Sequence, residues 1–66
     1  MKNNVKVQRA IANLTQAELA EKIGVSRQTI NAIEAGKYVP STVLALKMAK
    51  LFEKSVNDIF ELEADD

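Results

Sequence analysis

Residues 15–40, TQAELAEKIGVSRQTINAIEAGKYVP, constrain the fold of this chain more than any other stretch. Thr15 with Glu18 three residues later is a capping box, in which each side chain satisfies a backbone N–H at a helix start. Gly24 ends this first helix, because glycine adopts positive φ without a Cβ clash. Ser26 is a favourable N-cap residue and predicts that a second helix begins directly afterwards.

The apolar residues of this stretch are spaced as on two amphipathic helices. The first helix has three on one face: Leu19, Ala20 and Ile23. Ile30 and Ile33 form the inner side of the second helix, which ends at Gly36. The pattern predicts a helix-turn-helix over residues 16–35, with the small residue Ala20 where the two helices must approach closely.

The same stretch resembles the helix-turn-helix of phage Cro and repressor proteins and their small bacterial and archaeal relatives, the XRE-type regulators. The resemblance is carried by Gln16, Ala17, Glu18, Leu19, Ala20, Ile23, Gly24, Val25, Ser26, Ile30, Ile33, Glu34 and Gly36. It continues without a gap from about Val5 to Phe60. It implies an all-α, five-helix, lambda-repressor-like DNA-binding domain, whose second motif helix reads the major groove of double-stranded DNA.

The length and composition exclude several classes of protein. Sixty-six residues form one small domain, for which oligomerisation is a common source of additional stability. With no Cys and no His, we expect no disulfide, no metal site and no cofactor. No apolar run is long enough for a membrane span, and the N-terminus lacks an apolar signal region. We therefore expect a cytoplasmic protein of a prokaryote or its phage.

The formal net charge of zero hides a strong asymmetry. Residues 1–54 hold nine Lys and Arg against four acids, a net charge of +5. Residues 55–66 hold five acids and no base, a net charge of −5, and end in an acidic tail over residues 61–66. The basic part is suited to a polyanionic partner, whereas the tail is either functional or a solvated end without a role.

Three further helices are expected outside the motif, over residues 5–12, 42–53 and 56–60. Asn3 or Asn4 can cap the first of them, Ser41 caps the second, and Ser55 with Asp58 forms a capping box for the third. Core spacing in the first helix falls on Val7, Ala10, Ile11 and Leu14.

The helix over residues 42–53 is apolar on nearly all sides, so part of its surface is expected to meet a second subunit. The expected interface of a homodimer consists of Leu51, Ile59, Phe60 and Leu62. Residues 60–63 alternate apolar and polar, which fits either a short strand paired with residues 1–3 or a fraying tail. Fraying is favoured, because an isolated two-stranded pair is marginally stable.

A helical projection of residues 27–35 predicts which side chains contact DNA bases. Gln28, Asn31 and Ala32 point away from the inner side, and Arg27 lies on the flank. Gln and Asn can make bidentate hydrogen bonds to adenine, Arg can make them to guanine, and Ala can touch a thymine methyl group. The alternative is an ordinary solvated helix face. The family resemblance independently implies base contacts at Arg27, Gln28 and Asn31.

A second group of residues is expected to contact phosphates. Gln16 lies at a helix N-terminus, whose free N–H groups attract anions, and the family resemblance also implies a backbone contact there. The other phosphate candidates are Ser26, Thr29, Lys37, Tyr38, Lys6 and Arg9. For Lys6, an exposed side chain without a role is an equal alternative.

An ion pair is expected inside the domain. Glu34 projects about 40° from Ile30, which places it half-buried, and a half-buried carboxylate needs a partner. The family resemblance implies that Arg9 is this partner.

These features together predict a sequence-specific transcriptional regulator, a repressor that binds a two-fold operator as a homodimer. We expect no small-molecule ligand, because no second domain is present to sense one. The alternative is a protein-interaction component such as an antitoxin of a toxin–antitoxin pair. An enzyme is not indicated, because the chain has neither a Gly-rich phosphate loop nor a Ser/His/Asp set.

Overall fold

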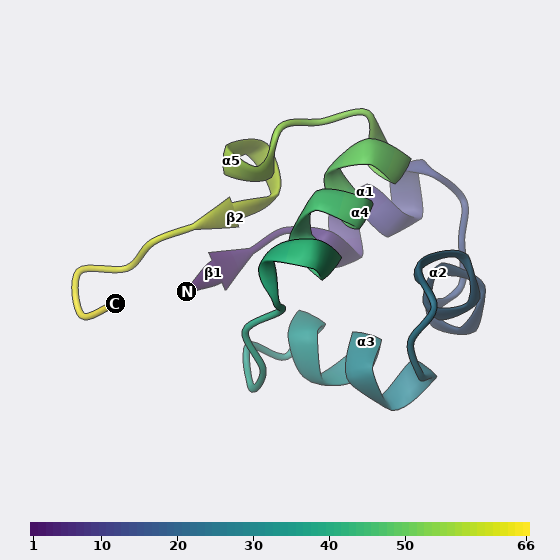
Figure 1. Ribbon diagram of the computed structural model, residues 1–66, viewed down its shortest axis with the longest axis horizontal. Helices are drawn as coiled ribbons and strands as arrows, with labels where there is room; N and C mark the ends of the chain where they lie inside the picture. Colours follow the sequence, from purple (N-terminus) through teal and green to yellow (C-terminus); the bar gives the residue numbers. More distant parts are fainter.

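The computed structural model describes residues 1–66 and contains five helices and two short strands (Figure 1). The helices are Val5–Ile11 (α1), Gln16–Ile23 (α2), Arg27–Glu34 (α3), Thr42–Phe52 (α4) and Val56–Ile59 (α5), and the strands are Lys2–Asn3 (β1) and Phe60–Glu61 (β2). The mainly helical fold with five helices confirms the predicted fold class. Each helix ends within one residue of its expected bounds.

The helix ends follow from local side-chain and glycine chemistry. Thr15 Oγ1 accepts a hydrogen bond from Glu18 N (3.0 Å), and Glu18 Oε1 accepts one from Thr15 N (2.9 Å), which completes the predicted capping box. Gly24 ends α2 with a φ of 77°, in the left-handed region that glycine adopts at little cost. Ser26 Oγ accepts from Thr29 N (3.2 Å) and caps α3.

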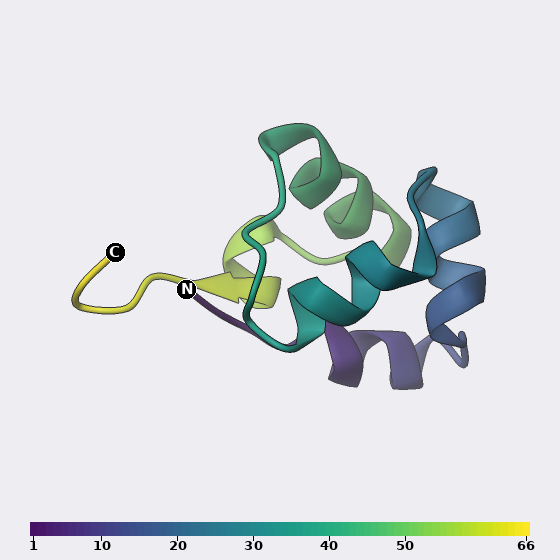
Figure 2. The same ribbon diagram turned by 90° about the horizontal axis from the view of Figure 1, so that it is seen from below.

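The helices surround one core to which all five helices and strand β2 contribute. Its largest fully buried side chains are Leu19, Ile30, Ile33, Met48, Ile59 and Val5. Viewed from below, α3 lies in front, with α1 on one side of it and α4 on the other (Figure 2). The inner side of α3 therefore packs on the core while its outer side is left uncovered.

The buried face of α1 differs from the predicted one. Val7 and Ile11 are 55% and 72% exposed, whereas Val5 and Gln8 are buried. The rotation of α1 is set by contacts outside the helix: Asn4 N donates to Ile59 O (2.9 Å), and Arg9 pairs with Glu34 on α3. The inward face of α1 thus contains the polar residues Gln8 and Arg9, so the apolar spacing of this helix predicted the wrong side.

The prediction that the tail frays is also wrong at its start, because β1 and β2 form an antiparallel pair with Lys2 opposite Glu61 and Asn3 opposite Phe60. A two-stranded pair is marginal in isolation. Here Asn4 Nδ2 donates to Asp58 O (3.0 Å), so side-chain contacts to α5 support the pair.

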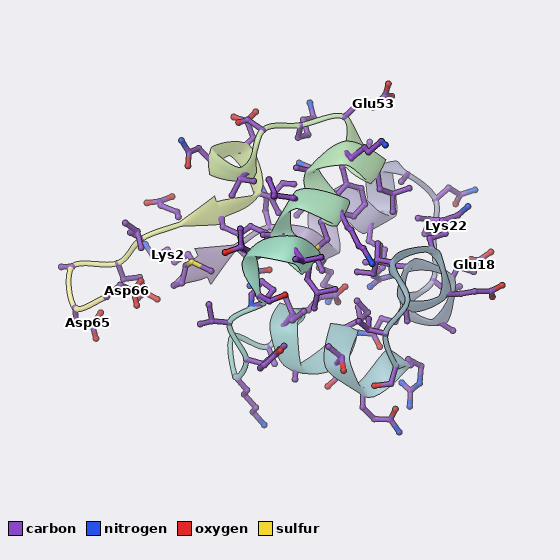
Figure 3. All side chains as sticks on the ribbon, in the orientation of Figure 1. Lys2, Glu18, Lys22, Glu53, Asp65 and Asp66 are labelled. Carbon is purple, nitrogen blue, oxygen red and sulfur yellow. The ribbon has the colours of Figure 1, made fainter.

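The acidic tail after Glu61 folds back on the N-terminus. The Met1 ammonium group lies 3.0 Å from Glu63 Oε1 and 3.1 Å from Asp66 Oδ2. The hydrogen bond to Glu63, followed by the one to Asp66, raises the pKa of the Met1 ammonium group. The backbone N–H of Glu63, followed by the Met1 ammonium group, lowers the pKa of Asp66. Asp65 and Asp66 lie near Lys2, at the end of the molecule away from α2 (Figure 3).

None of the helices is long and apolar enough to cross a membrane.

Candidate nucleic-acid interface

The outer face of α3 presents hydrogen-bonding side chains to solvent. Arg27, Gln28 and Asn31 are all exposed, and no other element covers this side of the helix (Figure 2). Ala32 is half-buried, so it lies at the edge of the face. Amide and guanidinium groups on an uncovered helix can reach base edges in a major groove, which is wide enough to admit an α-helix.

A hydrogen-bonded network underneath α3 holds this helix against α1 and α2. Arg9 Nε donates to Glu34 Oε2 (2.8 Å), and Arg9 Nη2 donates to Glu34 Oε1 (3.3 Å). The two side chains are only 17% and 7% exposed. The hydrogen bonds to Glu34 raise the pKa of Arg9. The ion pair expected between Arg9 and Glu34 is thus present and links the first helix to the end of the third.

Gln16 joins the same network. Its Nε2 donates to Glu34 Oε1 (3.1 Å), so the carboxylate of Glu34 accepts from both α1 and α2. Gln16 is the first residue of α2, where the helix leaves backbone N–H groups free, and this contact fixes its side chain. Its amide group is therefore held beside the kind of helix terminus that attracts anions.

The guanidinium group of Arg9 is engaged by partners inside the protein. In addition to the pair with Glu34, Arg9 Nη1 donates to Leu14 O (2.9 Å), so three of its nitrogens face protein partners. These contacts support a structural role for Arg9, and the phosphate contact expected of it stays a prediction.

The other phosphate candidates lie at the two ends of α3 and on α1. Lys37 and Tyr38 are exposed in the loop after α3, and Lys6 is exposed on α1. Ser26 Oγ and Thr29 Oγ1 lie 3.0 Å apart in the first turn of α3, so these hydroxyl groups share a hydrogen bond. Thr29 is half-buried and Ser26 is exposed, which leaves Ser26 the more accessible of the two.

An apolar surface forms on another side of the molecule. It consists of Met1, Val39, Pro40, Ala45, Leu46, Val56, Phe60 and Leu62, which line two adjoining grooves between α4, α5 and the chain ends. One of these grooves has a volume of ≈ 230 Å³. Its most exposed side chains are Leu62, Val39 and Leu46, at 75%, 60% and 56% exposure.

The four residues expected at a dimer interface lie in different places in the structure. Ile59 and Phe60 are 2% and 6% exposed and belong to the core, because α5 turns its inner side onto α4. Phe60 also lines the apolar surface, whereas Ile59 does not. Leu51 is half-buried and lines a different hollow, beside Lys22, Lys47 and Lys50. Only Leu62 of the four expected residues is widely exposed in the apolar surface.

Two hydrogen bonds to the end of α3 could not be predicted from the sequence. One is the hydrogen bond from Gln16 to Glu34, and the other is from Asn3 Nδ2 to Ile33 O (2.9 Å), at the end of α3. Their partners are 18 and 30 residues apart, and neither pair has a spacing that marks it.

Comparisons with known proteins agree with this geometry. The Helix-turn-helix family model matches residues 5–59. An HTH-type transcriptional regulator of Methanocaldococcus jannaschii is 59% identical over 66 residues, which covers 100% of both chains. The HTH-type transcriptional regulator YgzD of Bacillus subtilis is 51% identical over 65 residues, 98% of each chain.

The structural comparison gives the same fold. The solution structure of the SOS-response transcriptional repressor LexA from Eubacterium rectale matches with a TM-score of 0.81 and 30% sequence identity. The match covers 96% of this chain and 67% of that one.

Proposed function

We propose that this chain, which belongs to the XRE-type helix-turn-helix family and is a DNA-binding transcriptional regulator, represses transcription by binding a two-fold operator as a homodimer. The observation that carries the proposal is the exposed polar face of α3, anchored through Glu34 to Arg9 and Gln16. Repression would be steric, because a dimer that covers promoter DNA excludes other proteins from it. The solved relative is itself described as a transcriptional repressor.

In this proposal the two groups of DNA contacts have separate tasks. Arg27, Gln28 and Asn31 read base edges, and Ala32 contacts a thymine methyl group at the edge of the face. The phosphate contacts, which position the protein without reading sequence, are Gln16, Ser26, Thr29, Lys37, Tyr38 and Lys6. We expect no catalysis, no cofactor and no small-molecule ligand, so the protein concentration in the cytoplasm would control occupancy.

The apolar surface is the proposed homodimer interface. A dimer is stabilised when a second copy removes exposed apolar side chains such as Leu46 and Leu62 from water. A two-fold dimer would present two copies of α3 about one DNA turn apart, roughly 34 Å, so the operator should carry two related half-sites.

Selection of bound duplexes from a random DNA pool tests the function. The expected result is an enriched sequence with two-fold symmetry and half-sites about 10 base pairs apart. A reporter gene with this sequence placed in its promoter should then lose expression when the protein is produced. A pool that shows no enrichment after repeated rounds would contradict the proposal.

A charge in the apolar surface should weaken self-association. We expect Leu46→Lys and Leu62→Glu each to raise the dissociation constant of the dimer by about tenfold or more, because a charge buried at an interface is left unpaired. Operator affinity should fall in parallel. Sedimentation equilibrium and DNA titration measure the two effects.

Ile11→Lys is the matched control for this prediction, because Ile11 is 72% exposed on α1, outside the apolar surface. It should leave the dimer unchanged. A wild-type chain that stays monomeric at high micromolar concentration would refute the homodimer. If a second protein then co-purifies in a fixed ratio, the apolar surface serves a partner, as the antitoxin alternative requires.

A further inference from the structure

Asn3 connects the N-terminal strand to the end of the recognition helix. It lies in β1, and its half-buried side chain makes two hydrogen bonds. Asn3 Nδ2 donates to Ile33 O (2.9 Å) on α3, and Asn3 Oδ1 accepts from Val5 N (3.1 Å) at the start of α1. In both ribbon views β1 passes beside the end of α3 where the chain turns toward α4 (Figures 1 and 2). One amide group thus ties three elements together.

The partner carbonyl lies in the last turn of α3, where backbone C=O groups have no partner within the helix. Gly36 N donates to Ile33 O (3.0 Å), and Lys37 N donates to Ala32 O (2.9 Å), while Gly36 adopts a φ of 74°. These are the two hydrogen bonds of a Schellman motif. The Asn3 amide adds a side-chain donor to a backbone carbonyl of this helix end. Arg9 and Gln16 contact the same end of α3 only through the carboxylate of Glu34.

The position of this helix end matters because Lys37 and Tyr38 follow it directly. Both are exposed and lie at the rim of the α3 face, where the proposed function needs phosphate contacts. Contacts to phosphate are effective only when the donor is held near the backbone, since ordering a mobile loop on binding costs conformational entropy.

We propose that Asn3 is a positioning residue for DNA binding: its amide group fixes the last turn of α3 and thereby holds Lys37 and Tyr38 in place. This inference rests on the proposed function. It assigns no DNA contact to Asn3 itself, and it separates the role of Asn3 from that of Asn4. Asn4 Nδ2 donates to Asp58 O on α5, and Asn4 makes no hydrogen bond to α3.

The test compares Asn3→Asp with the matched control Asn4→Asp. Each variant loses one amide donor and gains one negative charge at a neighbouring position. Because the Asn3 side chain lies closer to α3, the uncharged pair Asn3→Ser and Asn4→Ser is measured as well and separates the loss of the hydrogen bond from repulsion of DNA by the new charge. Asn3→Asp also keeps the oxygen that accepts from Val5 N. We expect Asn3→Asp to weaken binding to operator and to random duplexes about 3- to 10-fold more than Asn4→Asp, the effect of one hydrogen bond.

Tyr38 provides a readout without DNA. It is the only Tyr in a chain without Trp, so its fluorescence reports on the loop after α3 without a label. We expect faster decay of Tyr38 fluorescence anisotropy in Asn3→Asp and an unchanged decay in Asn4→Asp. Circular dichroism shows whether each variant is folded, and the uncharged Asn3→Ser, too short to reach Ile33 O, replaces Asn3→Asp if that variant unfolds.

Equal DNA affinity and equal Tyr38 anisotropy in folded Asn3 and Asn4 variants would overturn the inference. A failure of the proposed function looks different, because wild-type protein would then prefer no DNA sequence. The anisotropy difference between the two variants could persist in that case, since it is measured on free protein.

Discussion

Gln28→Ala should weaken binding to the preferred operator by about 1–3 kcal/mol and leave binding to random DNA nearly unchanged. Gln28 is exposed in the first turn of α3, which is the part of a recognition helix that contacts base edges in related docking geometries. Only the specific complex uses such a contact, so the loss should be confined to the operator. Titration of labelled specific and random duplexes measures both affinities.

Lys37→Ala is the informative comparison, because Lys37 follows α3 and carries a compact ammonium charge. An ammonium group cannot make the bidentate hydrogen bonds by which Arg recognises a base. It should weaken operator and random DNA alike, and it should reduce the slope of log K against log salt by about one unit per subunit. Titrations at several salt concentrations give this slope.

Lys54→Ala is the matched control for Lys37→Ala. Lys54 follows α4 as Lys37 follows α3: its N donates to Ala49 O (3.0 Å), after a residue with positive φ. Its neighbour Glu53 lies at the opposite end of the molecule from α3 (Figure 3). Removing this charge should leave the salt slope unchanged. If Gln28→Ala and Lys37→Ala lose affinity in the same way on both duplexes, the assignment of α3 as the reading helix is wrong.

Arg9→Met should destabilise the domain by about 1–3 kcal/mol, because it leaves the carboxylate of Glu34 desolvated with only Gln16 as a side-chain donor. For a domain of this size, each kcal/mol lowers the melting temperature by about 4–8 °C. Thermal and urea unfolding followed by circular dichroism measure the loss. Lys6→Met on the exposed side of the same helix is the control, and it should change stability by no more than about 0.5 kcal/mol.

The double change Arg9→Met with Glu34→Gln should recover part of this loss, since it removes the unpaired charge along with its partner. The recovery measures the coupling between the two side chains. Strictly additive effects of the two single changes would show that Arg9 and Glu34 do not interact.

The network also links stability to the interface, because Gln16 depends on Glu34 for one of its contacts. Arg9 lies beneath the proposed DNA-binding face. Arg9→Met should therefore weaken DNA binding in two ways: it lowers the fraction of folded protein, and it disturbs the position of Gln16.

The sequence alone was sufficient for the helices and for the outer face of α3. Local groups determine where these helices begin and end. The Thr15–Glu18 capping box begins α2, Gly24 ends it, and Ser26 begins α3. Such contacts form whatever the rest of the chain does. The same local periodicity placed Ile30 and Ile33 inward and Gln28 outward, and the structure has them there.

Only the tertiary structure decided which side of α1 is buried, what the chain ends do and where the exposed apolar residues lie. Val7 and Ile11 have core spacing, but the Arg9–Glu34 pair and the contact of Asn4 with Ile59 turn α1 so that Val5 and Gln8 face inward.

The strand pair of the termini joins residues nearly sixty positions apart. It is stable here because α5 and the end of α3 supply backbone carbonyls that accept from the side chains of Asn4 and Asn3. The same packing buries Ile59 and Phe60 and leaves Leu46 and Leu62 outside. These features depend on how the helices pack against one another. The packing is stabilised by contacts between residues far apart in the sequence, and no periodic spacing along the chain predicts such contacts.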